Sequence, residues 1–274
     1  MQLVKLKSNL ELNVQILNTE ANKTVFMIHG MFGNLAQFYL TIAPLVAQKY
    51  KVVLFDLKSQ GRSMKKEVGY DFNSLAQEVI ELADALGYEK FSVLGYSFGC
   101  WVAFRCAINF PDRIEKVIAI ELPDWPKGRM IERGSYKPEH FMDFVNYLNT
   151  DVRDNFYKNK RQLRAAYLMY DYIFNYTTFS EDMNNEKELQ REDCERIKAP
   201  VLLAFGRKSV CFNELLRIAT WIPFADVYAE DGSHDFFLEK TQICSERIVA
   251  FLDSSNEFAN IYYEPVTAHD QAIS

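Results

Sequence analysis

The sequence has little of what nucleic acids, membranes or export require. Its 31 lysines and arginines are outnumbered by 37 aspartates and glutamates, so it lacks the basic excess that drives binding to phosphate backbones. No apolar stretch approaches the roughly 20 residues that span a bilayer. The N-terminus alternates apolar and polar residues and does not form the apolar core of a signal peptide. We therefore expect a cytoplasmic protein with no membrane span and no nucleic-acid partner.

Cysteine is also sparse. The five cysteines, at positions 100, 106, 194, 211 and 244, form neither a C-x-x-C pair nor a close cysteine–histidine spacing. An odd number of isolated cysteines in a chain of this size indicates reduced thiols in a reducing compartment. We expect no disulfide, no metal site and no cofactor.

What the sequence does contain is enough apolar material for a large core and a regular alternation of elements. The chain has 274 residues, of which 49% are hydrophobic. Short β-rich runs alternate with longer helical patterns, which predicts an α/β fold with a mostly parallel sheet flanked by helices. The predicted strands are Leu10–Leu17, Thr24–Ile28, Val52–Asp56, Phe91–Gly95, Ile114–Ile120, Pro200–Phe205 and Asp226–Ala229, with helices over Ser74–Leu86 and Phe98–Phe110.

The alternation stops near residue 125 and resumes near residue 198. The intervening pattern predicts helices over Pro138–Leu148 and Val152–Tyr176 and is rich in aromatic residues. Most of these should pack the helices onto the sheet, and a few should line a pocket. We therefore divide the chain into a core (1–124 and 196–253), an all-helical insertion (125–195) and a C-terminal extension (254–274).

One short stretch at the end of the fourth predicted strand carries chemistry. Residues 95–99 read Gly-Tyr-Ser-Phe-Gly, the G-x-S-x-G nucleophile elbow, between a strand and a helix as that motif requires. Its glycines are needed because a turn this sharp leaves no room for Cβ atoms. Ser97 would stand at a helix N-terminus, where backbone N–H groups stabilise negative charge.

With this elbow the chain resembles the α/β-hydrolase superfamily from about residue 10 to residue 252. His29-Gly30, followed by Met-Phe-Gly, is similar to the family's oxyanion loop. The segment 56–63, DLKSQGRS, resembles its D-x-x-G-x-G-x-S segment with Ser59 where glycine is usual, and 232–240, GSHDFFLEK, resembles the loop that carries the catalytic histidine. The resemblance implies a serine nucleophile, an oxyanion hole and a helical cap inserted after strand six, where the all-helical insertion falls.

Ser97 needs a base, since a serine hydroxyl is a weak nucleophile until a neighbour removes its proton. Of the four histidines, His29 belongs to the oxyanion loop, and His140 and His269 lie in the insertion and the extension. His234 follows the last strand in the order that the fold demands, so we assign it as general base and acid. The resemblance gives the backbone N–H groups of Met31 and Phe98 as the oxyanion hole.

The acid that completes the family's catalytic triad of serine, histidine and carboxylate is harder to identify, because Ser209 occupies the position where most of the family has a carboxylate. Some members carry the acid after strand six instead. There the chain offers Glu121 at the strand tip, our first choice, and Asp124 as the alternative. A dyad assisted by Ser209, or no triad at all, also fits the sequence. Two further carboxylates, Asp231 and Asp235, flank the histidine and are expected to be solvated.

Together these features predict a metal-free serine hydrolase acting on a small-molecule carboxylic ester or thioester with an apolar or aromatic acyl portion. Phe32, Tyr96 and Trp125 are expected to line the substrate pocket. A carrier-bound acyl group is a further candidate substrate, and the sequence indicates no oligomeric state. Alternatives are a C–C bond hydrolase or acyltransferase on the same machinery, and a binding protein that has lost the usual acid.

Overall fold

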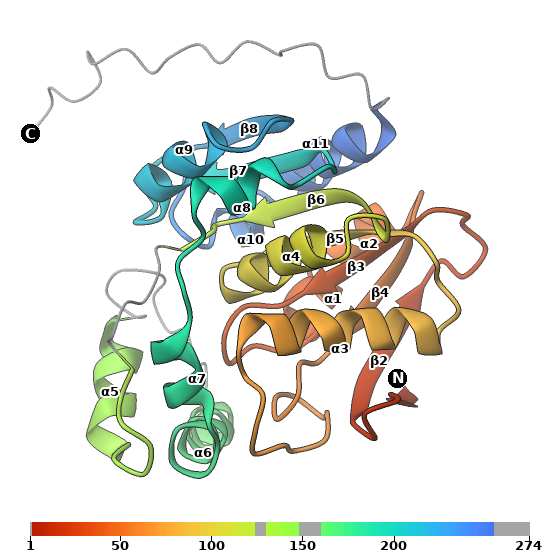
Figure 1. Cartoon of the computed structure of the whole chain (residues 1–274). Coiled ribbons are helices and arrows are strands. Elements are labelled where there is room, and N and C mark those ends of the chain that lie inside the picture. The colour runs from red at the N-terminus through yellow and green to blue at the C-terminus, as the bar shows by residue number, and fades with distance from the viewer. Residues whose placement is uncertain (1, 124–129, 148–159, 255–274) are drawn as a thin grey trace, which may run out of the picture.

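A computed structural model describes residues 2–123, 130–147 and 160–254 (Figure 1). The described chain contains one eight-stranded sheet in the order β1-β2-β4-β3-β5-β6-β7-β8. Strands from β4 to β8 along this order pair in parallel, whereas β1 and β2 pair antiparallel at one edge. The predicted fold class, a mostly parallel α/β sheet, is confirmed. The strands are β1 Gln2–Lys5, β2 Glu11–Leu17, β3 Thr24–Ile28, β4 Lys51–Phe55, β5 Phe91–Tyr96, β6 Ile114–Ile120, β7 Val201–Gly206 and β8 Ala225–Glu230.

Helices cover both faces of this sheet. The helices of the described chain are α1 Ala36–Tyr39, α2 Ile42–Val46, α3 Phe72–Ala85, α4 Phe98–Asn109, α5 Pro138–Tyr147, α6 Lys160–Tyr176, α7 Phe179–Asn185, α8 Arg191–Glu195, α9 Phe212–Ala219, α10 Phe236–Glu239 and α11 Thr241–Asp253. None of the described helices is both long enough and apolar enough to cross a bilayer.

Strand β3 shows why the core has two halves. All five of its residues are buried, as expected for a central parallel strand. Successive side chains of a strand point to opposite faces. Phe26 and Ile28 accordingly pack in one cluster with α3 and α4, and Val25 and Met27 pack in the other with α2 and α11. The sheet is therefore sealed from water on both sides, and its strand ends are fixed in position.

Between β6 and β7 the described residues form helices and no strand. Helices α5, α6 and α7 lie together beyond the carboxyl end of β6 (Figure 1), which is where the helical insertion was expected. The boundaries 125–195 stay a prediction. The part of the predicted helix over residues 152–159 and the pocket candidate Trp125 lie outside the described residues, as do the alternative acid Asp124 and residues 255–274 of the C-terminal extension.

Candidate active site

Ser97 sits in a strained turn between β5 and α4. Its backbone has φ 50° and ψ −119°, in the left-handed half of conformational space that residues with a Cβ rarely occupy. A Cβ on Gly95 would lie 2.3 Å from the Gly99 carbonyl oxygen, and one on Gly99 would lie 2.2 Å from that of Ile28. Only glycine fits at either position, so the flanking glycines of the motif have the steric cause that the sequence suggested.

His234 and Glu121 complete a chain of contacts with Ser97. His234, in the loop between β8 and α10, places Nε2 3.1 Å from Ser97 Oγ and Nδ1 3.1 Å from Glu121 Oε2. Because a carboxylate only accepts hydrogen bonds, Nδ1 carries the proton, and Nε2 is left to accept from the serine hydroxyl. The structure thus brings together the three side chains that the sequence singled out first.

Glu121 is held rigidly at the tip of β6. Its side chain is fully buried, and its backbone N–H donates to the Ala204 carbonyl at 2.8 Å. Its Oε1 accepts from the Gly206 N–H at 2.5 Å, and its Oε2 accepts from the Ser209 hydroxyl as well as from His234. Ser209 therefore stands where the family usually has its acid and hydrogen-bonds the carboxylate that comes from β6.

The surroundings of His234 favour the imidazolium form. Burial by itself lowers the pKa of this histidine, but its contacts with Cys211, whose Sγ lies 3.4 Å from Nδ1, and with the Glu121 carboxylate outweigh burial. The net effect raises the pKa of His234 above its ordinary value. A site with this bias stabilises the charge that forms when the imidazole takes a proton.

Tyr96 and Asp235 support the imidazole from behind. Asp235 is buried and accepts a hydrogen bond from the Tyr96 hydroxyl at 2.6 Å, so the expectation that it is solvated is wrong. The ring of the pocket candidate Tyr96 lies 5.3 Å from that of His234, and Tyr96 is only 5% exposed, so little of this side chain faces solvent. Asp231, by contrast, is exposed and pairs with Lys208 at 2.9 Å.

The expected oxyanion donors, Phe98 and Met31, belong to two segments next to Ser97. Phe98 is the first residue of α4, and the first N–H groups of a helix have no acceptor within it. Met31 belongs to a turn closed by the Gly33 N–H and the Gly30 carbonyl at 3.0 Å. A Cβ added to Gly30 would lie 3.5 Å from Ser97 Cβ, so this turn runs directly beside the serine.

His29 has a structural place in the same loop. It is fully buried, its Nε2 accepts from the Leu57 N–H at 3.0 Å, and its Nδ1 is 2.8 Å from the Gly30 carbonyl, to which it donates. Burial lowers the pKa of His29, which matches a neutral ring that uses one nitrogen as donor and the other as acceptor. The ring fixes the loop that holds Met31.

Aromatic side chains from the helical segment reach the loops around Ser97. The ring of Phe32, a pocket candidate, lies 3.7 Å from that of Tyr170, 5.5 Å from Phe174 and 5.9 Å from Phe179. Phe98, next to the serine, lies 6.2 Å from Phe179. These contacts form an aromatic wall, made of Phe32, Tyr170, Phe174 and Phe179, between the oxyanion loop and helices α6 and α7.

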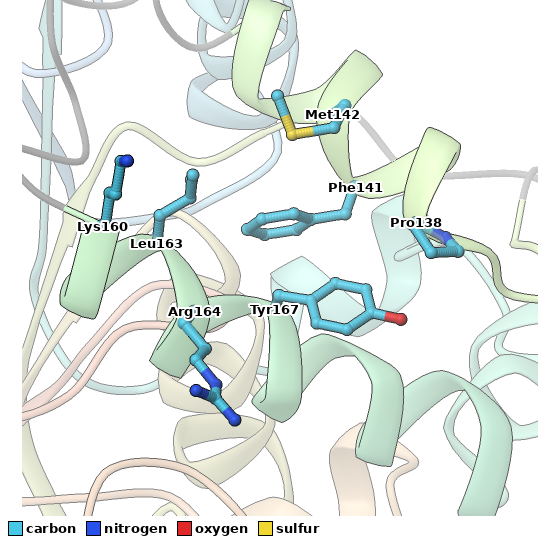
Figure 2. A pocket seen from close by; sticks show the side chains of 7 residues that line it. All are labelled: Pro138, Phe141, Met142, Lys160, Leu163, Arg164 and Tyr167. Atoms are coloured by element: carbon cyan, nitrogen blue, oxygen red, sulfur yellow. The ribbon is translucent and has the colours of Figure 1, made fainter.

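A cavity of about 340 Å³ opens between α5 and α6 (Figure 2). Its lining includes Phe141, Met142 and Leu163, with Lys160 and Arg164 as the charged members. Tyr170 contacts both Phe141, at 5.2 Å between ring centroids, and Phe32. Phe141 therefore links the lining of this cavity to the aromatic wall.

One further group of ligand-type atoms lies behind the imidazole. Glu121, Cys211 and His234 each offer an atom that can bind a metal ion, and the three atoms lie within 4.8 Å of one another. No sequence pattern indicated this group, because its members lie in three separate segments: Glu121 follows β6, Cys211 immediately precedes α9, and His234 lies in the loop after β8.

Comparison with known proteins agrees with the fold. A model of the alpha/beta hydrolase fold matches residues 23–169. The chain is 30% identical to a fluoroacetate dehalogenase from Burkholderia sp. over 36% of its own length and 34% of the dehalogenase. It is 23% identical to a candidate esterase/lipase from Haemophilus influenzae over 88% of its length and 87% of that protein.

Solved structures extend the likeness to most of the described chain. The enol-lactonase from Burkholderia xenovorans superposes with a TM-score of 0.76 at 18% identity, covering 92% of this chain and all of that one. This likeness concerns the fold. The chain spans between 28% and 38% of the length of four curated relatives that it matches, so the similarity in sequence to these is concentrated in one segment.

Proposed function

Because the chain belongs to the alpha/beta hydrolase family, whose model matches more than half of it, we propose that it is a serine hydrolase that cleaves a carboxylic ester or thioester through an acyl-enzyme. The observation that carries this proposal is the continuous contact chain from Ser97 Oγ through His234 to Glu121. A chain of nucleophile, base and buried carboxylate is what acyl transfer by serine requires.

In the first half of the reaction the Ser97 hydroxyl gives its proton to His234 Nε2 as Oγ attacks the substrate carbonyl. The negative charge that develops on the carbonyl oxygen is stabilised by the N–H groups of Met31 and Phe98 and by the N-terminus of α4. The imidazolium formed at His234 faces Glu121, whose negative charge offsets it. His234 then returns the proton to the leaving alcohol or thiol.

In the second half a water molecule takes the place of the leaving group. His234 removes its proton, the resulting hydroxide attacks the acyl carbon, and Ser97 leaves with the proton that His234 returns. The same three side chains serve both halves. The role of Glu121 is to orient the ring and to stabilise its positive charge.

The aromatic wall supports a substrate with an apolar or aromatic acyl portion. Phe32 belongs to the oxyanion loop and its ring lies 3.7 Å from that of Tyr170, so an acyl chain leaving the Ser97 region would meet aromatic carbon. The substrate class is therefore a small molecule or a carrier-bound acyl group, joined through an ester or thioester. A pure binding role is less well supported, since such a protein has no use for a histidine aligned on a serine.

Hydrolysis of p-nitrophenyl butyrate by the wild-type protein and by Ser97→Ala tests the proposal. The substitution should abolish turnover, with a loss of roughly 10⁴-fold or more. Ser245→Ala is a matched control, since Ser245 is a buried serine on α11 whose hydroxyl donates only to the Thr241 carbonyl. Equal activity of wild type and Ser97→Ala, with circular dichroism unchanged, would remove Ser97 from the mechanism.

A further inference from the structure

Cys211 is a buried thiol that the proposed mechanism does not use. Its side chain is 1% exposed, and its Sγ lies 3.4 Å from His234 Nδ1, on the side of the ring that faces away from Ser97. The Cys211 N–H donates to Ser209 Oγ at 3.1 Å, and that hydroxyl in turn donates to Glu121. The thiol is thus fixed by the same hydrogen bonds that hold the carboxylate.

Two of the separations among the three potential ligand atoms are close to those of a tetrahedral zinc site, and all three atoms lie within 4.8 Å of one another. Metal distances of about 2.1 Å to nitrogen and oxygen and about 2.3 Å to sulfur imply separations of about 3.4 Å between nitrogen and oxygen and about 3.6 Å between nitrogen and sulfur at tetrahedral angles. The observed separations are 3.1 Å from Nδ1 to Glu121 Oε2 and 3.4 Å from Nδ1 to Cys211 Sγ. Each is a few tenths of an ångström shorter than the tetrahedral value.

From this geometry we propose that Cys211, His234 Nδ1 and Glu121 form a binding site for Zn²⁺ or another thiophilic divalent cation. One thiolate, one imidazole and one carboxylate are ligands that suit zinc and cadmium, whereas magnesium and calcium prefer oxygen alone. The thiolate and the carboxylate carry two negative charges, which balance the cation in a buried place. The fourth position is left for water. His234 is the most exposed of the three, with 20% of its side chain open, so the cation enters from its side.

Occupation of this site inhibits the enzyme, a consequence that rests on the proposed function. The cation takes the nitrogen lone pair at Nδ1, so the single proton of the neutral ring moves to Nε2, and the thiol proton of Cys211 leaves to solvent. Nε2 then donates and cannot accept the proton of Ser97. The bound cation therefore holds His234 in the tautomer that cannot accept the Ser97 proton. The step involves no oxidation or reduction.

Binding is tested without activity by titrating the Ser97→Ala protein with Cd²⁺ and recording the ultraviolet charge-transfer absorption of a cadmium–thiolate bond. We expect the absorption to saturate at about one equivalent, as three converging ligands predict. Adding Cys211→Ser should abolish it. Adding Cys106→Ser instead should leave it intact, because Cys106 is an equally buried thiol on α4 that contacts the Ala76 carbonyl. If Cys211→Ser does not fold, the NMR chemical shift of cadmium bound to the unsubstituted protein is measured instead. This shift distinguishes a site with one thiolate ligand from a site with none.

Inhibition is tested by the effect of Zn²⁺ on ester hydrolysis and its reversal by a chelator. The quantity compared is the Zn²⁺ concentration that halves the metal-free rate of each protein. This concentration should be at least tenfold higher for Cys211→Ser than for wild type, since the loss of a direct metal ligand weakens binding by that order or more. Absence of thiolate absorption, or absorption and inhibition that survive Cys211→Ser, would overturn the site. Absorption that follows Cys211 in a protein without esterase activity would keep the site and refute the proposed function.

Discussion

Glu121 is the residue whose charge the proposed mechanism needs most. It is fully buried, two of its partners are N–H and O–H donors from β7 and the loop after it, and the third is His234. A buried carboxylate with every oxygen in use is an orienting group whose loss cannot be replaced by water. Its effect on the reaction should therefore appear in turnover and not in binding.

Glu121→Gln should lower kcat by roughly two to four orders of magnitude with little change in KM, because the amide keeps the volume but cannot offset the imidazolium. Steady-state kinetics on p-nitrophenyl butyrate measure both constants. Asp231→Asn is the matched control, since Asp231 is an exposed carboxylate on the histidine loop that pairs with Lys208. Near-wild-type turnover in Glu121→Gln would show that another group supplies the charge.

The pH profile follows from the raised pKa of His234. Only the neutral imidazole accepts a proton from Ser97, so kcat/KM should rise with pH along an acid limb whose midpoint lies above 6.5, the ordinary histidine value. The Glu121 charge is one cause of the upward shift. Its removal in Glu121→Gln should therefore move the midpoint of the residual activity to lower pH. A midpoint that stays in place, or moves up, would contradict the assignment of the acid limb to this pair.

At the scale of elements, the local pattern predicted much of the fold. The buried run of β5, the elbow and helix α4 were all readable, because a strand of apolar residues, two glycines that admit no Cβ and a helical period each leave a local mark. Helices α1 and α2 were not expected, since elements of four and five residues are too short to show a period. Strand β1 was also missed, because it is a four-residue strand at the edge of the sheet, too short to show a clear period, and it pairs only with β2.

Ser59 illustrates a departure that the sequence showed and the structure explains. It stands where the family has glycine and adopts φ 61°, the left-handed conformation that glycine usually supplies. Its hydroxyl accepts from the Lys66 N–H at 2.9 Å and from the Tyr70 hydroxyl at 2.7 Å. Hydrogen bonds made by the side chain therefore compensate for the strain, which no pattern of sequence could reveal.

The glycines of the elbow give a direct test of element packing. Gly99→Ala should destabilise the fold by about 3 kcal/mol or more, because its Cβ would stand 2.2 Å from the Ile28 carbonyl oxygen and the backbone has to move. Gly87→Ala is the control: Gly87 has φ 80° but nothing within 4 Å of an added Cβ, so it should cost only about 1 to 2 kcal/mol. Urea unfolding compares the two. If the two variants lose the same free energy of unfolding, α4 does not pack against β3 as closely as the structure indicates.

The aromatic wall makes a prediction about chain length. Tyr170→Ala removes the ring that contacts Phe32 and should shift preference toward longer acyl chains, raising kcat/KM for an octanoate relative to an acetate ester by about tenfold, as roughly 1 to 3 kcal/mol of pocket contact allows. Tyr176→Ala is the control, since Tyr176 lies on the same helix and is 58% exposed. A profile unchanged in Tyr170→Ala would make the helical segment a scaffold with no part in selecting the substrate.

At the scale of the whole molecule, the site is an assembly of strand ends. Ser97 follows β5, Glu121 follows β6, and His234 follows β8, and parallel pairing brings these ends to one edge of the sheet. The family resemblance carried the order of the three residues, and this order led from Ser209 to Glu121 as the source of charge. The resemblance could not place Tyr96, Asp235 or Cys211 around the imidazole. The contact between Tyr96 and Asp235 depends on side-chain packing between segments more than a hundred residues apart. Cys211 lies in a loop that carries no motif.

The central claim, that Ser97 is a nucleophile activated by His234 and Glu121, is tested most directly by labelling with a fluorophosphonate followed by mass spectrometry of the intact protein and its peptides. The account predicts one adduct per chain, on the peptide that contains Ser97. The adduct should be absent in Ser97→Ala and should form at least about a hundredfold more slowly in Glu121→Gln and His234→Ala, because both lose base activation. An unlabelled wild-type protein, or a label on another residue that persists in Ser97→Ala, would contradict it.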